Sequence, residues 1–245
     1  MNLPAIISEP LTALLGEQCY VTLIEDLNVT DVECIKYAIS KGLGFGIVLG
    51  GCIVKIPQIL TILRNKSAEG LSMSSYLMET FSYAITLAYN LRQGNPFSTF
   101  GEVLFIMLQN IVIMMLILLF GRQYRAIFFT LFNFVGLLYC LCSAKVVPSW
   151  ALASLYAAAI PLSLASKIPQ IFSNLSNKST GQLSVFSVIN YFAGSIARVF
   201  TTMTELDDPL MLGGVVLASI LNGVLVLQVF LYWGNKVELK QSKTE

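Results

Sequence analysis

Four ionisable side chains interrupt the apolar segments of this chain, and their types favour a binding function. Lys55, Glu79, Lys167 and Arg198 each lie inside a long apolar stretch. A charge at that depth of a bilayer costs about 2.5–3.5 kcal/mol on insertion scales, so each position needs an explanation. Three cations and one carboxylate leave a positive surplus, which favours an anionic ligand such as a phosphate headgroup if all four face one cavity.

These charges also have simpler explanations that the residues leave open. Lys55 and Lys167 lie towards the cytosolic ends of their predicted helices, so both can snorkel to the headgroups. Glu79 comes within reach of Lys55 if their two helices pack side by side. Arg198 lies before an acidic cluster and can extend towards it.

The segment around Lys55 occurs twice in the chain. A shift of 112 residues aligns 55–76 with 167–188, and both copies share K-I-P-Q followed by N-K-S. Chance matches between apolar helices produce Leu and Ile, but not this polar pattern. The duplication therefore predicts a repeated structural unit.

Each copy contains a proline where a helix is predicted. Pro57 and Pro169 are expected to kink their helices, because proline removes one backbone hydrogen bond and clashes with the preceding turn. Gln58 and Gln170 either satisfy the freed carbonyls or face a cavity between the repeats. Paired kinks suit hinges for alternating access, and the alternative is that the prolines only shape the helices.

The elements that must position these residues are predicted to be membrane helices. Of 245 residues, 56% are hydrophobic and 12% charged, far from the average for soluble domains. The mean hydropathy is +0.73. Apolar segments long enough to cross roughly 30 Å of hydrocarbon occur seven times. The predicted spans are 39–63, 72–91, 102–120, 126–144, 147–172, 183–204 and 210–233.

The duplication groups these seven helices as 3+1+3. Three spans invert the side of the membrane, so two copies share one orientation only if a further helix separates them. The predicted fold class is an all-α membrane protein with seven transmembrane helices in a parallel-repeat bundle. Its parts are a lumenal tail (1–38), a first repeat (39–120), a linker helix (121–146), a second repeat (147–233) and a cytosolic tail (234–245).

Basic residues in the loops predict the orientation of the chain. Eight basic residues flank one side, and three flank the other, which also carries the acidic N-terminal segment. The N-terminus is therefore expected to be lumenal or extracellular and the C-terminus cytosolic. The eight are Arg64, Lys66, Arg122, Arg125, Lys178, Lys236, Lys240 and Lys243, and the three are Lys36, Arg92 and Lys145.

Cysteines and glycines yield two structural expectations. Cys19 and Cys34 fall in the predicted lumenal tail, where an oxidising compartment permits a disulfide. Gly42, Gly46 and Gly50 recur every four positions, which predicts a groove for close helix packing on one face of the first span.

The composition argues against several classes of function. The chain has no histidine, which removes Ser-His-Asp, Cys-His and imidazole metal chemistry. It also lacks a Walker-type loop and a basic patch with interleaved aromatic residues, so neither ATP-driven transport nor nucleic-acid binding is supported. We expect no enzymatic activity, no cofactor and no metal.

The duplicated "KIPQI" helices and the 3+1+3 plan resemble the PQ-loop superfamily, which includes the SWEET sugar transporters and the lysosomal cystine transporter. Within it, "SKGLGFGIVLGG", "NKSAEGLSM", "NPFSTFGEVLFIMLQ", "TGQLSVFSV", "GSIARVFT" and "DDPLMLGGVVLASILNG" resemble the mannose-P-dolichol utilization defect protein family over about 36–234. The resemblance implies a non-enzymatic endoplasmic reticulum membrane protein. Such a protein is needed to use dolichyl-phosphate-linked mannose and glucose in N-glycan, GPI-anchor and related glycosylation.

The resemblance implies that lipid-linked sugars are presented or flipped, with lumenal glycosyltransferases as possible partners. Pro57, Gln58, Pro169 and Gln170 are then hinge and cavity elements, and the two repeat lysines are candidate phosphate contacts. The alternative function is transport of a free small solute such as a sugar. Its path needs neutral hydrogen-bonding groups, for which the candidates are Asn110, Asn190 and Asn222.

Overall fold

The computed structural model describes residues 4–164, 167–179 and 185–232, and the described part of the chain is helical. The prediction of an all-α protein is therefore confirmed. The elements are α1 (Ala5–Tyr20), η1 (Val21–Glu25), α2 (Val32–Ile53), α3 (Ile56–Asn65), α4 (Met73–Gln93), η2 (Phe97–Thr99), α5 (Gly101–Phe120), α6 (Tyr124–Cys142), α7 (Ser149–Leu164), α8 (Lys167–Asn177), α9 (Val185–Glu205) and α10 (Pro209–Leu231).

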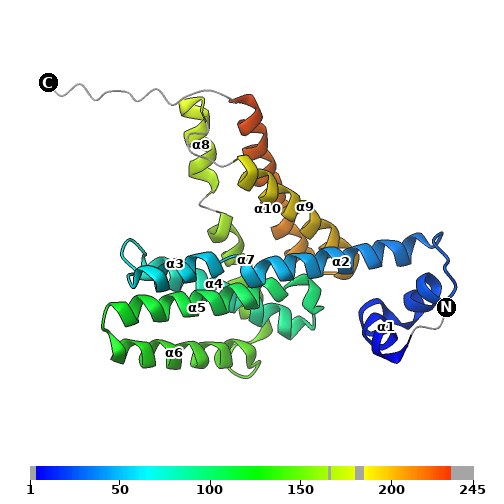
Figure 1. The fold of residues 1–245 in the computed structure, drawn as a ribbon, viewed down its shortest axis with the longest axis horizontal. Coiled ribbons are helices and arrows are strands. Elements are labelled where there is room, and N and C mark those ends of the chain that lie inside the picture. The colour runs from blue at the N-terminus through cyan, green and yellow to red at the C-terminus, as the bar shows by residue number, and fades with distance from the viewer. Residues whose placement is uncertain (1–3, 165–166, 180–184, 233–245) are drawn as a thin grey trace. The chain divides into compact units, whose positions relative to one another are not determined.

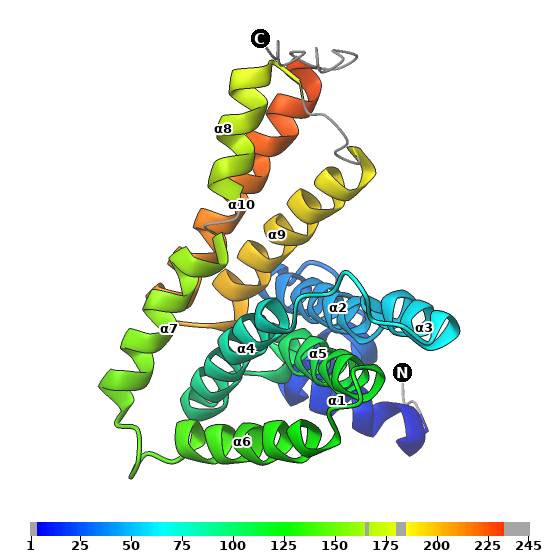
Figure 2. The same ribbon diagram turned by 90° about the vertical axis from the view of Figure 1, so that its left-hand side faces the viewer.

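The chain forms two compact units. The first comprises Met1–Ala159 together with Thr204–Leu206, and the second comprises Ile160–Met203 and Asp207–Glu245. In the first unit α5 is the central helix and packs against α2, α3, α4 and α6 (Figures 1 and 2). In the second unit α8 packs alongside α10 (Figure 2).

The first predicted span is broken into two helices beside its proline. α2 ends at Ile53, and α3 begins at Ile56 with Pro57 in its first turn, where a missing backbone N–H costs little. Gln109 of α5 bridges the break. Its Nε2 donates to the Gly51 carbonyl at 2.7 Å, and its Oε1 accepts from the Lys55 backbone N–H at 2.9 Å. Gln109, rather than the neighbouring Gln58, therefore satisfies the backbone at the break.

The second copy repeats features of this backbone. α8 begins at Lys167 and has Pro169 in its first turn, while residues 165–166 lie outside the described part. Lys66 and Lys178, the lysines of the two N-K-S motifs, follow α3 and α8 and have left-handed φ angles of 48° and 47°. Few non-glycine residues adopt this conformation, so the shared motif ends both helices in the same way.

The close-packing face of α2 differs from the predicted one. A Cβ on Gly42, Gly46 or Gly50 would meet no atom within 4 Å in the described structure. Instead, Gly51 and Gly44, two turns apart, lie against α5 and η2. A Cβ on Gly51 would lie 2.5 Å from the Glu102 Cβ. The four-residue spacing indicated a periodicity but did not identify the side of the helix that meets a neighbour.

Gly51→Ala is expected to lower stability, whereas Gly50→Ala is not. At position 51 the added Cβ also lies 2.9 Å from the Glu102 Cα, so the helices must separate at a cost of about 1–3 kcal/mol. At position 50 the Cβ enters open space, so the mutation leaves stability unchanged or raises it. Thermal unfolding of the detergent-solubilised proteins measures both effects. Equal melting temperatures for the two variants would contradict this packing.

Five of the described helical segments have the length and hydropathy of membrane spans. They are Val32–Asn65, Gly101–Phe120, Tyr124–Cys142, Ser149–Asn177 and Pro209–Leu231. The second and sixth predicted spans correspond to α4 and α9, which are 21-residue helices with more polar sequences. The apolar helices agree with a multi-pass membrane protein, whereas the seven-span 3+1+3 arrangement and its orientation stay predictions.

Candidate functional site

The break between α2 and α3 places the Lys55 side chain against a polar face of α4. Lys55 Nζ lies 2.8 Å from Glu79 Oε2 and 3.0 Å from Glu79 Oε1. Tyr83 Oη donates to Glu79 Oε1 at 3.0 Å, and Gln58 Nε2 donates to Tyr76 Oη at 2.6 Å. Tyr76, Glu79 and Tyr83 follow the i, i+3, i+7 spacing of one helix face. The structure thus brings together three residues that the sequence singled out: Lys55, Gln58 and Glu79.

This polar cluster is accessible to a ligand. The Lys55 and Glu79 side chains are 18% and 37% exposed. An ammonium group has three N–H donors, and the carboxylate oxygens of Glu79 accept two of them. A further acceptor, such as a phosphate oxygen, can therefore approach Lys55 without displacing its partner.

The equivalent lysine of the second repeat has a neutral partner. Lys167 Nζ donates to Asn222 Oδ1 of α10, and Asn222 Nδ2 donates to the Tyr191 carbonyl at 3.2 Å. The 112-residue shift places Tyr191 where the first repeat has Glu79. Asn222 therefore does not neutralise the charge of Lys167 in the way that Glu79 neutralises the charge of Lys55.

Asn110 differs from its repeat equivalent Asn222. Asn110 is fully buried, and neither its Nδ2 nor its Oδ1 has a hydrogen-bond partner in the described structure. Lys55, the residue that corresponds to Lys167, is paired with Glu79 instead. Because buried amides are nearly always hydrogen-bonded, this exception calls for a functional or conformational explanation.

The remaining candidates lie elsewhere in the second unit. Gln170 is partly buried on α8, and Asn190 is exposed on α9. Arg198 is buried in α9, with its carbonyl accepting from Thr201 Oγ1 at 3.1 Å. Lys55 belongs to the first unit, and Lys167 and Arg198 belong to the second, so a single cavity shared by all the cations stays a hypothesis.

An ion pair within the first unit was missed by sequence reasoning. Lys41 Nζ lies 2.7 Å from Glu205 Oε2, and the two side chains are 8% and 0% exposed. Ser40 Oγ and Ser98 Oγ each donate to the Glu205 carboxylate at 2.6 Å. The pair is separated by 164 residues, so no local spacing indicated it.

The Glu205 carboxyl lies just beyond the predicted span 183–204. Burial by itself raises the pKa of this carboxyl. Hydrogen bonds from Lys41, Ser40 and Ser98, together with the charge of Lys41, outweigh burial and hold the pKa of Glu205 below its ordinary value. The group is therefore ionised, and the buried Lys41 has a full counter-charge.

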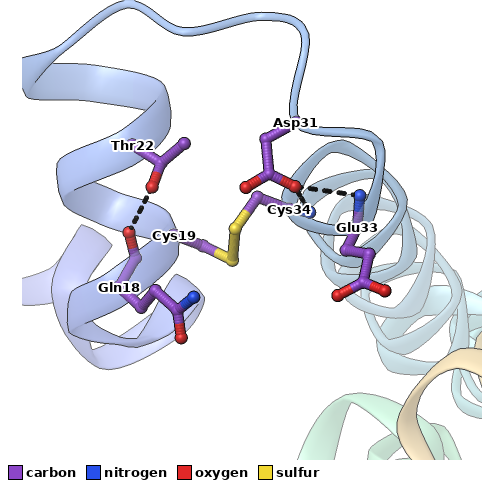
Figure 3. Close-up of a disulfide and its surroundings, with 6 residues drawn as sticks. All are labelled: Gln18, Cys19, Thr22, Asp31, Glu33 and Cys34. Carbon is purple, nitrogen blue, oxygen red and sulfur yellow. Dashed lines mark hydrogen bonds between the residues drawn. A yellow bond between two sulfur atoms is a disulfide. The ribbon is translucent and has the colours of Figure 1, made fainter.

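A disulfide joins α1 to the first turn of α2. Cys19 and Cys34 are bonded, with their Cα atoms 5.2 Å apart (Figure 3). Asp31 caps α2 beside the bond by accepting from the Glu33 and Cys34 backbone N–H groups at 3.1 Å. The disulfide therefore anchors the N-terminal helix to the first long helix, and the cap stabilises the start of α2 beside it.

The helices and repeated polar sites define a helical membrane protein with an internal duplication. The PQ-loop repeat family matches this chain at residues 39–99 and 152–211, one match in each copy of the duplication. Human solute carrier family 66 member 3 is 26% identical over 187 residues, which cover 75% of this chain and 90% of that protein. No solved structure matches. The predicted relationship to PQ-loop proteins is confirmed.

Proposed function

We propose that this PQ-loop membrane protein binds dolichyl-phosphate-linked mannose and glucose in the endoplasmic reticulum membrane. It makes these sugars usable by lumenal glycosyltransferases, either by presenting or by flipping them, without catalysing a reaction. The main support is the accessible Lys55–Glu79 pair at the break of a long apolar helix. The sequence resemblance to the mannose-P-dolichol utilization defect protein family supplies the substrate class.

The charges at the two repeat sites support a phosphate ligand. A phosphodiester carries a negative charge and oxygen acceptors, and lysine is a common point-charge partner for phosphate. Lys167 contacts a neutral amide, and Lys55 is accessible despite its counter-ion. A cation next to hydrocarbon is costly, and an anionic lipid headgroup offsets that cost.

The second candidate is transport of a free small solute. It is favoured by the similarity to a protein named as a solute carrier. The buried amides of Asn110 and Asn222, at equivalent repeat positions, are groups that hydrogen-bond neutral sugars. In this alternative the lysines orient the helices, and the substrate carries no lipid.

Removing the charge of both repeat lysines is expected to block use of the lipid-linked donor. Cells that lack the protein should accumulate short lipid-linked oligosaccharides while dolichyl-phosphate-mannose stays normal. Re-expressed wild-type protein should restore full length, and Lys55→Gln/Lys167→Gln should not. Losing a charge-assisted hydrogen bond costs about 1.5–3 kcal/mol, or roughly tenfold or more in binding. Oligosaccharide length, donor level and protein abundance are measured together.

The matched control is Lys66→Gln/Lys178→Gln. These lysines also occupy equivalent repeat positions, but they are exposed at helix ends. This variant should restore full-length oligosaccharides. Normal oligosaccharides in cells lacking the protein would contradict the dolichol function and favour free-solute transport. Full rescue by Lys55→Gln/Lys167→Gln would show that these charges are not needed.

A further inference from the structure

An apolar pocket of about 620 Å³ lies between α4 and α6 in the first unit. Its walls are formed mainly by aliphatic and aromatic side chains from the two helices. The apolar lining residues are Leu77, Met78, Phe81, Phe129, Phe134 and Leu137. The pocket lies on a different face of α4 from the polar cluster of Tyr76, Glu79 and Tyr83.

The pocket has little capacity to bind a polar molecule. Its polar lining residues are Thr130 and Asn133. Asn133 Nδ2 already donates to the Phe129 carbonyl of its own helix at 2.7 Å. A sugar site needs several convergent hydrogen-bonding groups, which these two residues do not supply. The lining instead matches a hydrocarbon ligand.

The exposed apolar surface around the pocket indicates that the pocket faces lipid. α6 has the hydropathy of a membrane span, yet only 11% of the residues in its most apolar stretch are buried inside the protein. Met78 and Phe129, one from each wall, are 62% and 68% exposed. Such surface is stable in the hydrocarbon region of a bilayer but costly in water. Lipid chains, rather than aqueous solutes, therefore have direct access to the pocket.

We propose that this pocket holds the polyisoprenyl chain of the dolichyl-phosphate-linked sugar; this inference rests on the proposed function. Glu79 and Met78 are consecutive residues of α4, so the headgroup and chain sites lie at the same level of one helix, on different faces. A lipid whose phosphate contacts Lys55 can pass its chain around α4 into the pocket. α4 thus separates a polar subsite from an apolar one. It contacts the headgroup of the amphipathic ligand on one face and the hydrocarbon chain on another.

Photocrosslinking of the full chain in phosphatidylcholine nanodiscs tests this assignment. One probe is a polyprenyl phosphate with a diazirine on its chain, and the other is a phosphatidylcholine with a diazirine on an acyl chain. The polyprenyl probe should label the α4 and α6 walls, and excess dolichyl phosphate should lower that labelling about tenfold. Excess phosphatidylcholine should not.

Two pocket-filling variants and one matched control locate the labelled site. Thr130→Trp and Leu137→Trp place a large side chain in the pocket and should lower labelling about tenfold. Phe128→Trp adds an equally large side chain at a position that is 76% exposed and outside the lining, so labelling should persist. Using two filling variants guards against the misfolding of either one.

The outcomes separate this inference from the proposed function. Equal labelling by the acyl probe, with no competition by dolichyl phosphate, would overturn the inference and show that bulk lipid occupies the pocket. If that result accompanied a Lys55- and Lys167-dependent oligosaccharide defect, the proposed function would still stand. Competed pocket labelling in a protein whose loss leaves oligosaccharides unchanged would support the lipid site and overturn the proposed function.

Discussion

Glu205→Ala should lower the free energy of unfolding by about 3–5 kcal/mol, because it leaves a buried lysine without its counter-charge. The Glu205 side chain is fully buried and accepts hydrogen bonds from Lys41, Ser40 and Ser98. Once the carboxylate is removed, Lys41 Nζ retains the Ser98 hydroxyl, 3.2 Å away, and the face of the Tyr37 ring, whose centroid is 5.0 Å away, but no anionic partner among the described residues. Thermal and denaturant unfolding of the purified protein in detergent measure the loss.

A double variant distinguishes the pair from the surrounding packing. Lys41→Met/Glu205→Leu removes both charges and replaces them with apolar groups, so most of the stability should return. Asp207→Ala is the matched single control, because this nearby acidic side chain is exposed. If Glu205→Ala lowered the free energy of unfolding by less than about 1 kcal/mol, the buried ion pair would contribute no more than an exposed pair does.

Asn110→Leu and Asn222→Leu should shift stability in opposite directions although they alter equivalent repeat positions. Leucine relieves the unpartnered buried amide of Asn110, which should raise the free energy of unfolding by about 1–3 kcal/mol. At position 222 the same change removes the acceptor of Lys167 and the donor to the Tyr191 carbonyl. A decrease of about 1–3 kcal/mol follows there. Unfolding of the two variants side by side measures both signs.

The same pair tests why Asn110 has no hydrogen-bond partner among the described residues. A group that functions at a cost to stability should yield a more stable but less active protein when it is replaced. Asn110→Leu should therefore unfold at a higher temperature and restore oligosaccharide length poorly in cells. If Asn110→Leu were instead destabilised as much as Asn222→Leu, a partner such as a buried water must satisfy the amide.

Local patterns in the sequence predicted much of the architecture. The apolar segments identified membrane helices, and the duplicated K-I-P-Q and N-K-S motifs identified two equivalent units that match PQ-loop repeats. The helix break beside Pro57 is a local feature, since it involves only a few neighbouring residues. The left-handed conformation of Lys66 and Lys178 is local in the same sense. The possible contact of Lys55 with Glu79 was also visible, since consecutive membrane helices commonly pack together.

Contacts between distant segments were not visible in those patterns. Gln109 bridges the broken helix from α5, Gly51 rather than Gly50 faces that helix, and Lys41 meets Glu205 across 164 residues. Each depends on the rotation of a helix about its axis, and an apolar span presents similar side chains on every face. The chain therefore encodes its helices, its repeat and its ionisable positions locally. Packing selects which buried polar groups become partners, and within the described part of the chain it leaves Asn110 without one.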